Sequence, residues 1–198
     1  VGMASGPAVG QAVASIGQPS PAHIGYAAKL LESLPAAVVS AAHEPYGARA
    51  VVYALLLDRH PATRHHQLSR LAASADRGVV DETARLSPLV QHLDPQLRLP
   101  LLDIALPALR ALTATEYRLL KENVVALVEA DDQIDLFEWS LHRILLRGLD
   151  TWHGRVPRAR IRRRTVASVH ADCELLMSVL AHAGQRDRGA GRRAFEQA

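Results

Sequence analysis

The chain has 198 residues, a length that suits one domain with a substantial core. Its apolar content of 48% is ordinary for a globular protein, its aromatic content of 4% is low, and its net charge is +3. A single cysteine, Cys173, excludes an internal disulfide and a cysteine-based zinc site, and no apolar run reaches the roughly 18 residues of a membrane span.

The N-terminal residues 1–20 are rich in Gly, Ala, Ser and Pro, which predicts a flexible linker. The chain starts at Val1, without an initiating Met or the charged n-region of a signal peptide, so we expect a fragment of a longer protein. Ser20 and Pro21 predict the start of the first helix, with Ser as the N-cap and Pro in the first turn.

Apolar residues recur at helical spacing through the rest of the chain, and Pro or Gly separates successive segments. Thr113 and Glu116 have the spacing of a capping box. The nearly continuous apolar segment 99–112 is expected to be the central buried helix, bent at Pro107. The helices are expected at about 21–34, 36–43, 45–57, 61–78, 81–93, 99–112, 114–128, 136–149 and 165–184.

No segment alternates apolar and polar residues as a strand does. The sequence therefore predicts an all-α fold, a single bundle of about seven to nine helices over residues 21–184. Residues 185–198 are expected to form a C-terminal tail or a short final helix.

Four carboxylates crowd the corner between two of these helices: Asp131, Asp132, Asp135 and Glu138. Asp135 and Glu138 have capping-box spacing, so they can cap backbone amides. The same four groups are hard oxygen ligands suited to Ca²⁺ or Mg²⁺, although their spacing is not that of an EF-hand loop. Both interpretations stay open. The nearby aromatic side chains are expected in the core: Phe137, Trp139 and Trp152.

Positive charge is concentrated near the C-terminus. Residues 1–154 have a charge balance of −3, whereas residues 155–198 have a balance of +6. This segment can bind the phosphates of nucleic acid or of an anionic membrane, or it can be a solvated loop that pairs with the acidic remainder. The lack of interleaved aromatic residues argues against binding of single-stranded nucleic acid. Its arginines are Arg155, Arg158, Arg160, Arg162, Arg163 and Arg164.

The histidines offer two further candidates, and both are weak. His60, His65 and His66 lie near Asp58, but adjacent side chains on a helix point about 100° apart, which favours solvated histidines over a metal site. His43-Glu44 runs into Pro45 and lacks the second His of a zinc-protease helix. With no phosphate-binding Gly loop or nucleophile elbow either, we expect no catalytic activity in this fragment.

Residues 130–138, read as Ala-Asp-Asp-Gln-Ile-Asp-Leu-Phe-Glu, resemble the Ala-Asp-Gly-x-Ile-Ser-x-x-Glu signature of TerB-like tellurite-resistance domains. Asp132 replaces the Gly of that pattern, and Asp135 replaces the Ser. The resemblance implies a compact all-helical domain whose acidic corner is associated with metal binding.

A second resemblance covers more of the chain. Four segments are similar, in the same order, to the soluble region that follows the protease domain of bacterial HtpX-like membrane zinc metallopeptidases. The resemblance implies a non-catalytic cytosolic domain, tethered to the inner membrane through an upstream segment. It also implies that the zinc is confined to the protease domain of the longer parent protein. The segments are residues 44–49, 53–58, 99–110 and 136–139.

From this resemblance we expect a regulatory or interaction domain that requires no cofactor of its own and binds its own protease domain or another subunit. Two alternatives remain. The domain is a divalent-cation sensor at the acidic corner, or it binds an anionic membrane or nucleic acid through the arginines of residues 155–164.

Overall fold

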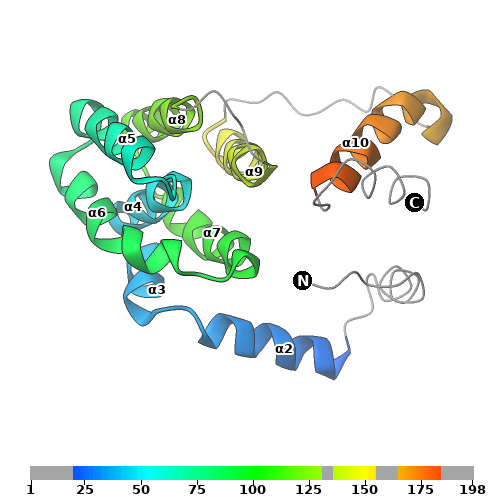
Figure 1. Ribbon diagram of the computed structural model, residues 1–198, viewed down its shortest axis with the longest axis horizontal. Helices are drawn as coiled ribbons and strands as arrows, with labels where there is room; N and C mark the ends of the chain where they lie inside the picture. The colour runs from blue at the N-terminus through cyan, green and yellow to red at the C-terminus, as the bar shows by residue number, and fades with distance from the viewer. Residues whose placement is uncertain (1–19, 131–135, 155–164, 184–198) are drawn as a thin grey trace.

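Every regular element is helical in the residues that the computed structural model describes, which are 20–130, 136–154 and 165–183 (Figure 1). The predicted all-α class is therefore confirmed. The elements are α2 (Pro21–Glu32), α3 (Ala36–Ala42), α4 (Pro45–Leu56), α5 (Pro61–Ser74), α6 (Arg77–Gln91), α7 (Pro95–Leu109), α8 (Ala114–Val128), α9 (Leu136–Trp152), the short 3-10 helix η1 (Val166–Val169) and α10 (His170–Ala183).

The helix starts follow local sequence signals. Proline occupies the first turn of α4, α5 and α7, where its missing N–H costs no hydrogen bond. The capping box before α8 is confirmed, because the Thr113 hydroxyl accepts the backbone N–H of Glu116 at 3.3 Å and the Glu116 carboxylate accepts that of Thr113 at 2.9 Å. The hydrogen bonds that the Glu116 carboxylate accepts from the backbone N–H and the hydroxyl of Thr113 lower the pKa of Glu116.

Two helices begin earlier than the sequence predicted. The segment expected to start at residue 81 is α6, which starts at Arg77, and Gly78 lies inside it. A Cβ at Gly78 would lie 2.5 Å from the Tyr46 hydroxyl, so this glycine leaves room for the end of the Tyr46 side chain. The segment expected at residue 99 is α7, which starts at Pro95 because the Asp94 carboxylate caps it by accepting the N–H of Gln96 at 2.9 Å.

The central helix is α4, and not the 99–112 segment as predicted. Every residue of α4 from Gly47 to Leu56 is buried, and the helix packs against α3, α6, α7 and α8. By contrast, α7 buries one side through residues such as Leu101 and Leu102, while Leu99 and Asp103 on its other side are exposed. The charged residue in α4 does not keep this helix at the surface, because the side chain of Arg49 is itself buried.

The buried polar side chains of α4 bind partners on other helices. Arg49 forms an ion pair with Asp76 at the N-cap of α6, at 2.8 Å, and approaches Glu116 of α8 at 3.7 Å. The Tyr53 hydroxyl accepts a 3.0 Å hydrogen bond from the amide nitrogen of Asn123 in α8. Burial raises the pKa of Tyr53 to about 12, so the phenol stays neutral. These bonds fix α4 relative to α6 and α8.

The remaining helices lie around this centre. α9 packs on α7 and α8 and buries Leu141, Leu145 and Leu149 against them. α2 and α10 lie at the margin, away from α4 (Figure 1). The main packing partner of α10 among the described elements is η1. None of the described helices combines the length and the hydropathy that crossing a bilayer requires.

Candidate interaction surface

A polar cavity of about 330 Å³ lies where the C-terminal end of α4 meets the start of α9. Its lining includes Asp58, Arg59, Arg98 and Glu138, two carboxylates and two guanidinium groups. The Arg98 guanidinium stacks over the Phe137 ring at 5.0 Å from its centroid. The lining of this cavity therefore carries charges of both signs.

Asp58 and Gln67 build the corner beside this cavity. The Asp58 carboxylate accepts the backbone N–H of His60, and the Asp58 N–H donates to the Gln67 side chain at 2.8 Å. The Gln67 amide nitrogen also donates to the carbonyls of Leu56 at 3.1 Å and Leu127 at 3.2 Å, which joins the C-terminal ends of α4 and α8. Both side chains therefore serve the fold, because they satisfy backbone groups that the helix ends leave unpaired.

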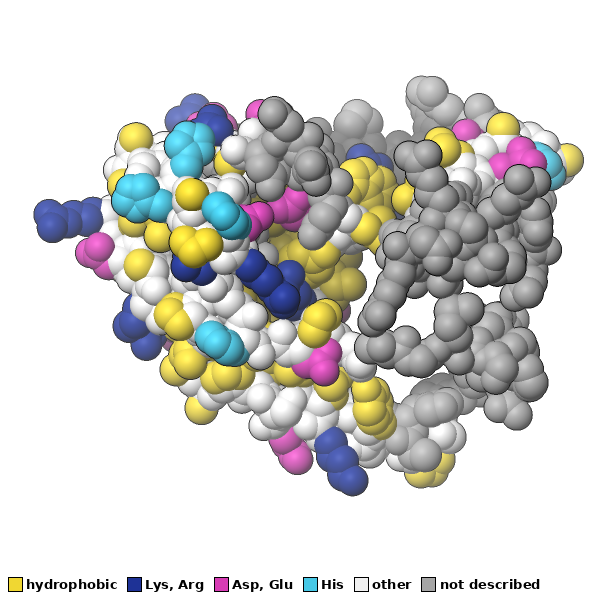
Figure 2. All heavy atoms as spheres, in the orientation of Figure 1, with side chains coloured by type: hydrophobic (Ala, Val, Ile, Leu, Met, Phe, Trp, Pro, Cys, Tyr) yellow, Lys and Arg dark blue, Asp and Glu magenta, His cyan; other side chains and the backbone are white. Residues whose placement is uncertain are grey.

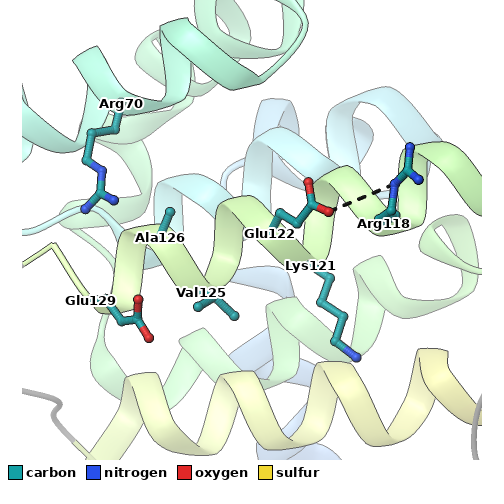
Figure 3. Close-up of a pocket in the computed structure, with 7 residues that line it drawn as sticks. All are labelled: Arg70, Arg118, Lys121, Glu122, Val125, Ala126 and Glu129. Carbon is teal, nitrogen blue, oxygen red and sulfur yellow. Dashed lines mark ion pairs between the residues drawn. The ribbon is translucent and has the colours of Figure 1, made fainter.

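A second, larger cavity of about 540 Å³ is an open groove beside α8 (Figure 3). Arg70 reaches toward it from α5, while Lys121 extends from α8 toward α9. Arg118 forms an ion pair with Glu122 at 4.0 Å, and Val125 supplies apolar surface. A groove that is open and mixed in charge has the character of an ordinary protein surface.

Between α8 and α9, a group of titratable side chains holds the two helices together. The Tyr117 hydroxyl donates to Asp150 at 2.7 Å, and the Lys121 ammonium donates to the same carboxylate at 3.1 and 3.2 Å. The Tyr117 ring stacks on His153 with centroids 4.4 Å apart. Burial, together with the charges of Arg143 and Lys121, lowers the pKa of the half-buried His142.

Two tryptophans of α9 are exposed, and each lies beside an arginine. Trp139 is 50% exposed, with the Arg143 guanidinium 5.9 Å from the centre of its ring. Trp152 is 63% exposed, with the Arg110 guanidinium of the α7 C-cap at 5.6 Å. The prediction that both indoles belong to the core was wrong, whereas Phe137 is half-buried against the core. The guanidinium groups cover part of each indole, so these rings do not require burial in the bundle.

The sequence-predicted site residues fall largely outside the described part of the chain. Of the acidic corner, only Glu138 is described, and it lies half-buried in the first turn of α9. Its predicted partners Asp131, Asp132 and Asp135 lie outside the described residues, as do all six arginines of residues 155–164. The metal and anion predictions at these positions therefore stay predictions.

The histidines of α5 do not converge. His60, His65 and His66 are exposed, and the histidine side chains visible in Figure 2 lie at separate places on one face of the molecule. Within residues 20–130, 136–154 and 165–183, no three His, Cys, Asp or Glu side chains are grouped as metal ligands would be.

Sequence reasoning missed the exposed tryptophans of α9 as surface residues. A signal existed: arginine stands four residues after Trp139, which places the two side chains on the same face of a helix. The Arg110–Trp152 pair had no such signal, because it joins two helices that are distant in sequence. Comparisons with protein-family models, with curated proteins and with solved structures gave no match.

Proposed function

We propose that this chain is a non-catalytic interaction domain, in which the bundle of α3 to α9 is the scaffold and α9 presents residues to a protein partner. The observation that carries the proposal is the pair of exposed indoles, Trp139 and Trp152, each stacked with a guanidinium. Tryptophan and arginine are the residues that contribute most often to the energetic centre of protein interfaces. Their stacked arrangement limits the rotamer entropy that binding would cost.

The use of polar groups inside the bundle supports the non-catalytic part of the proposal. Arg49, Gln67 and Asn123 are buried, and each binds a group on another helix. The two cavities described above contain carboxylates beside guanidinium groups, the composition of solvated surface pairs. Contacts between helices account for these polar residues, so the proposal assigns them no role in bond cleavage.

The resemblance to HtpX-like enzymes gives the proposal a context. On that basis, the chain would be a cytosolic appendage of a membrane-bound zinc metallopeptidase, and its partner would be the protease domain or another subunit of the same assembly. The zinc would belong to the protease domain, and this chain would require no cofactor.

Site-specific photo-crosslinking tests the proposal. Benzoyl-phenylalanine is placed at Trp139 and separately at Trp152, in the cells that naturally make the chain. The matched control is Tyr46, an aromatic residue that is 45% exposed and lies on α4 beside α3 and α6. We expect the two α9 positions to capture one and the same protein, and the Tyr46 position not to capture it.

Two results would contradict the proposal. In the first, adducts form equally at all three positions or at none of them. In the second, the isolated chain hydrolyses a casein substrate in a metal-dependent manner, which would show catalysis in the fragment itself. If the captured protein is a zinc peptidase, the predicted parent is identified as well.

A further inference from the structure

We propose that the outward side of α9 binds an acidic segment of the partner protein, one that carries apolar side chains among its carboxylates. This outward side consists of exposed residues only: Leu136, Trp139, Arg143, Ile144 and Arg147. The inference rests on the proposed function and adds the chemistry of the partner to it. It is carried by the apolar side chains, the unpaired guanidinium groups and the burial of the opposite side of the helix.

The opposite side of α9 is already used by the bundle. Leu141, Leu145 and Leu149 follow one another at intervals of four residues, and all three are fully buried where α9 packs on α7 and α8. Residues about half a turn away from these leucines point away from the bundle. A partner can therefore reach α9 on its outward side while the helix stays packed.

Apolar side chains are spread along the outward side. Trp139 is 50% exposed, and Leu136 and Ile144 are each 37% exposed. The eight residues from Leu136 to Ile144 extend about 12 Å along the helix axis. An indole beside aliphatic side chains is suited to the apolar centre of a protein interface, where tryptophan contributes much of the binding energy.

The guanidinium groups among these apolar side chains lack a carboxylate. The Arg143 guanidinium lies 5.9 Å from the ring centre of Trp139, and Arg147 follows one turn later on the same side. Among the residues that the structure describes, neither arginine forms an ion pair. Arg118 of α8, by contrast, pairs with Glu122 one turn away. Two positive charges are thus left for a partner to neutralise.

The carboxylates of α9 do not neutralise its outward side. Glu138 is half-buried and lines the polar cavity at the start of the helix. Asp150 is also half-buried, and it accepts hydrogen bonds from the Tyr117 hydroxyl at 2.7 Å and from the Lys121 ammonium at 3.1 and 3.2 Å. Within α9, which the structure describes in full, no exposed side chain is acidic. Carboxylates of a partner would therefore complement the outward side.

Other occupants fit these features less well. A bilayer requires an apolar side that can insert among lipid chains, but the leucines of α9 are buried in the bundle and its outward side mixes apolar with charged residues. Nucleic acid gains its affinity from many phosphate contacts, whereas the outward side has two guanidinium groups. A second copy of the chain would bring like charges together across a two-fold interface.

Two synthetic peptides that differ only in charge test the proposal on the full chain. One is a helical peptide with leucines every third or fourth residue and glutamates beside them, and the other has glutamine in place of each glutamate. We expect the acidic peptide to bind at least about tenfold more tightly at about 50 mM salt, and the difference to shrink at about 500 mM salt. Binding is followed by the fluorescence of the chain, whose only two tryptophans both lie in α9.

Paired arginine variants locate the binding site. The double variant Arg143→Gln, Arg147→Gln is expected to bind the acidic peptide at least about tenfold more weakly and to change the binding of the glutamine peptide little. The matched control is Arg70→Gln, Arg77→Gln, which removes the same charge from exposed positions on α5 and α6 and should bind like the wild type. Glutamine has nearly the helix propensity of arginine, so both variants should keep the helical circular dichroism of the wild type.

The outcomes separate this inference from the proposed function. The inference is overturned if the two peptides bind equally or not at all, or if the control pair weakens binding as much as the α9 pair. Tighter binding of duplex DNA or of phosphatidylserine vesicles through Arg143 and Arg147 would also overturn it. In each of these cases, capture of one protein at Trp139 and Trp152 would still support the interaction domain. Peptide binding as predicted without that capture would instead contradict the proposed function and support the acidic preference of α9.

Discussion

At the scale of single residues, Gln67 contributes more to the fold than its polarity suggests. Its side chain is 1% exposed, accepts the N–H of Asp58 and donates to the carbonyls of Leu56 and Leu127. These groups lie at the ends of α4 and α8, where no further turn of helix can pair them. Gln67 therefore replaces hydrogen bonds that two helices lose at their C-terminal ends.

Replacing Gln67 with methionine should destabilise the chain by about 2–4 kcal/mol, because similar volume is retained while buried backbone groups lose their partner. The free energy of unfolding is measured by urea titration. Gln96→Met is the control: Gln96 is exposed, and its side chain accepts an exposed hydrogen bond from the Tyr26 hydroxyl that water can replace, so the same substitution there should change the free energy by no more than about 1 kcal/mol. Equal effects of the two variants would show that the buried hydrogen bonds of Gln67 are not the cause.

His142 should make the stability of the bundle depend on pH. Its Nε2 atom is buried without a hydrogen-bond partner, and burial is the largest cause of its lowered pKa, followed by the charges of Arg143 and Lys121. The negative charges of Asp150 and Glu129 oppose this shift more weakly. The pKa in the folded state thus lies below the unfolded value of about 6.5, so the unfolded chain takes up the proton first as pH falls.

The stabilising contribution is therefore present above about pH 6.5 and is lost as pH falls through the folded-state pKa. We expect His142→Gln to lose less stability than the wild type between about pH 7.5 and about pH 5.5, measured by urea unfolding at both values. His66→Gln, which removes an exposed histidine, should lose as much as the wild type. The same loss in all three proteins would contradict the role given to His142.

The exposure of individual side chains was the part of the structure least predictable from sequence. Trp139 and Trp152 were expected in the core because large aromatic side chains usually are buried. Their guanidinium partners come from one turn along α9 for Trp139 and from α7 for Trp152. Only the first of these contacts has a local sequence signal, because α7 meets α9 through tertiary packing.

At the scale of helices, Gly47 sets the distance between α3 and α4. A Cβ atom at this position would lie 2.8 Å from both the carbonyl carbon and the Cα of Ala41. These are backbone atoms of α3, so they cannot move aside as a flexible side chain can. The close approach therefore depends on the absence of a side chain at residue 47.

Gly47→Ala should destabilise the chain by about 1–3 kcal/mol, because the added methyl group overpacks the contact between the two helices. Gly148→Ala is the matched control on α9, where the nearest atom to a new Cβ is Leu106 Cδ2 at an ordinary 3.6 Å. That variant should be neutral or stabilised by up to about 1 kcal/mol, since alanine is the better helix former. A thermal melt of each variant distinguishes the two effects, and destabilisation by both would indicate a general intolerance of alanine instead of a steric contact.

The starts of helices that carry a local sequence signal were predictable. Which helix is buried at the centre of the bundle was not. The Thr113–Glu116 capping box and the prolines at Pro45 and Pro61 gave correct boundaries, because capping and proline geometry act within a few residues. The central position of α4 is a matter of tertiary packing, and its buried Arg49 pairs with Asp76, 27 residues away, so no local signal indicates it. Periodicity shows which residues share a face, but it does not show which face other helices cover.

At the scale of the whole molecule, the described chain combines a packed scaffold with surface helices that it does not bury. Among the described residues, the buried core extends from Leu34 to Leu149, Leu30 of α2 packs half-buried against it, and no described residue of α10 belongs to it. α2 approaches the bundle through a 2.7 Å hydrogen bond from the Tyr26 hydroxyl to Gln96, whereas the large apolar side chains of α10 remain exposed. Because other helices form the core of the bundle, such surface helices can bind a partner while the bundle stays folded.

The most direct measurement is the free energy of unfolding of the full chain after the apolar side of α10 is made polar. We predict that the combined replacement of Leu175, Leu176, Val179 and Leu180 with glutamine leaves this free energy, measured by urea titration, within about 0.5 kcal/mol of the wild type. The side chains are exposed, so their removal costs the core nothing. A loss of more than about 2 kcal/mol would show that α10 packs into the fold and is not free to bind anything else.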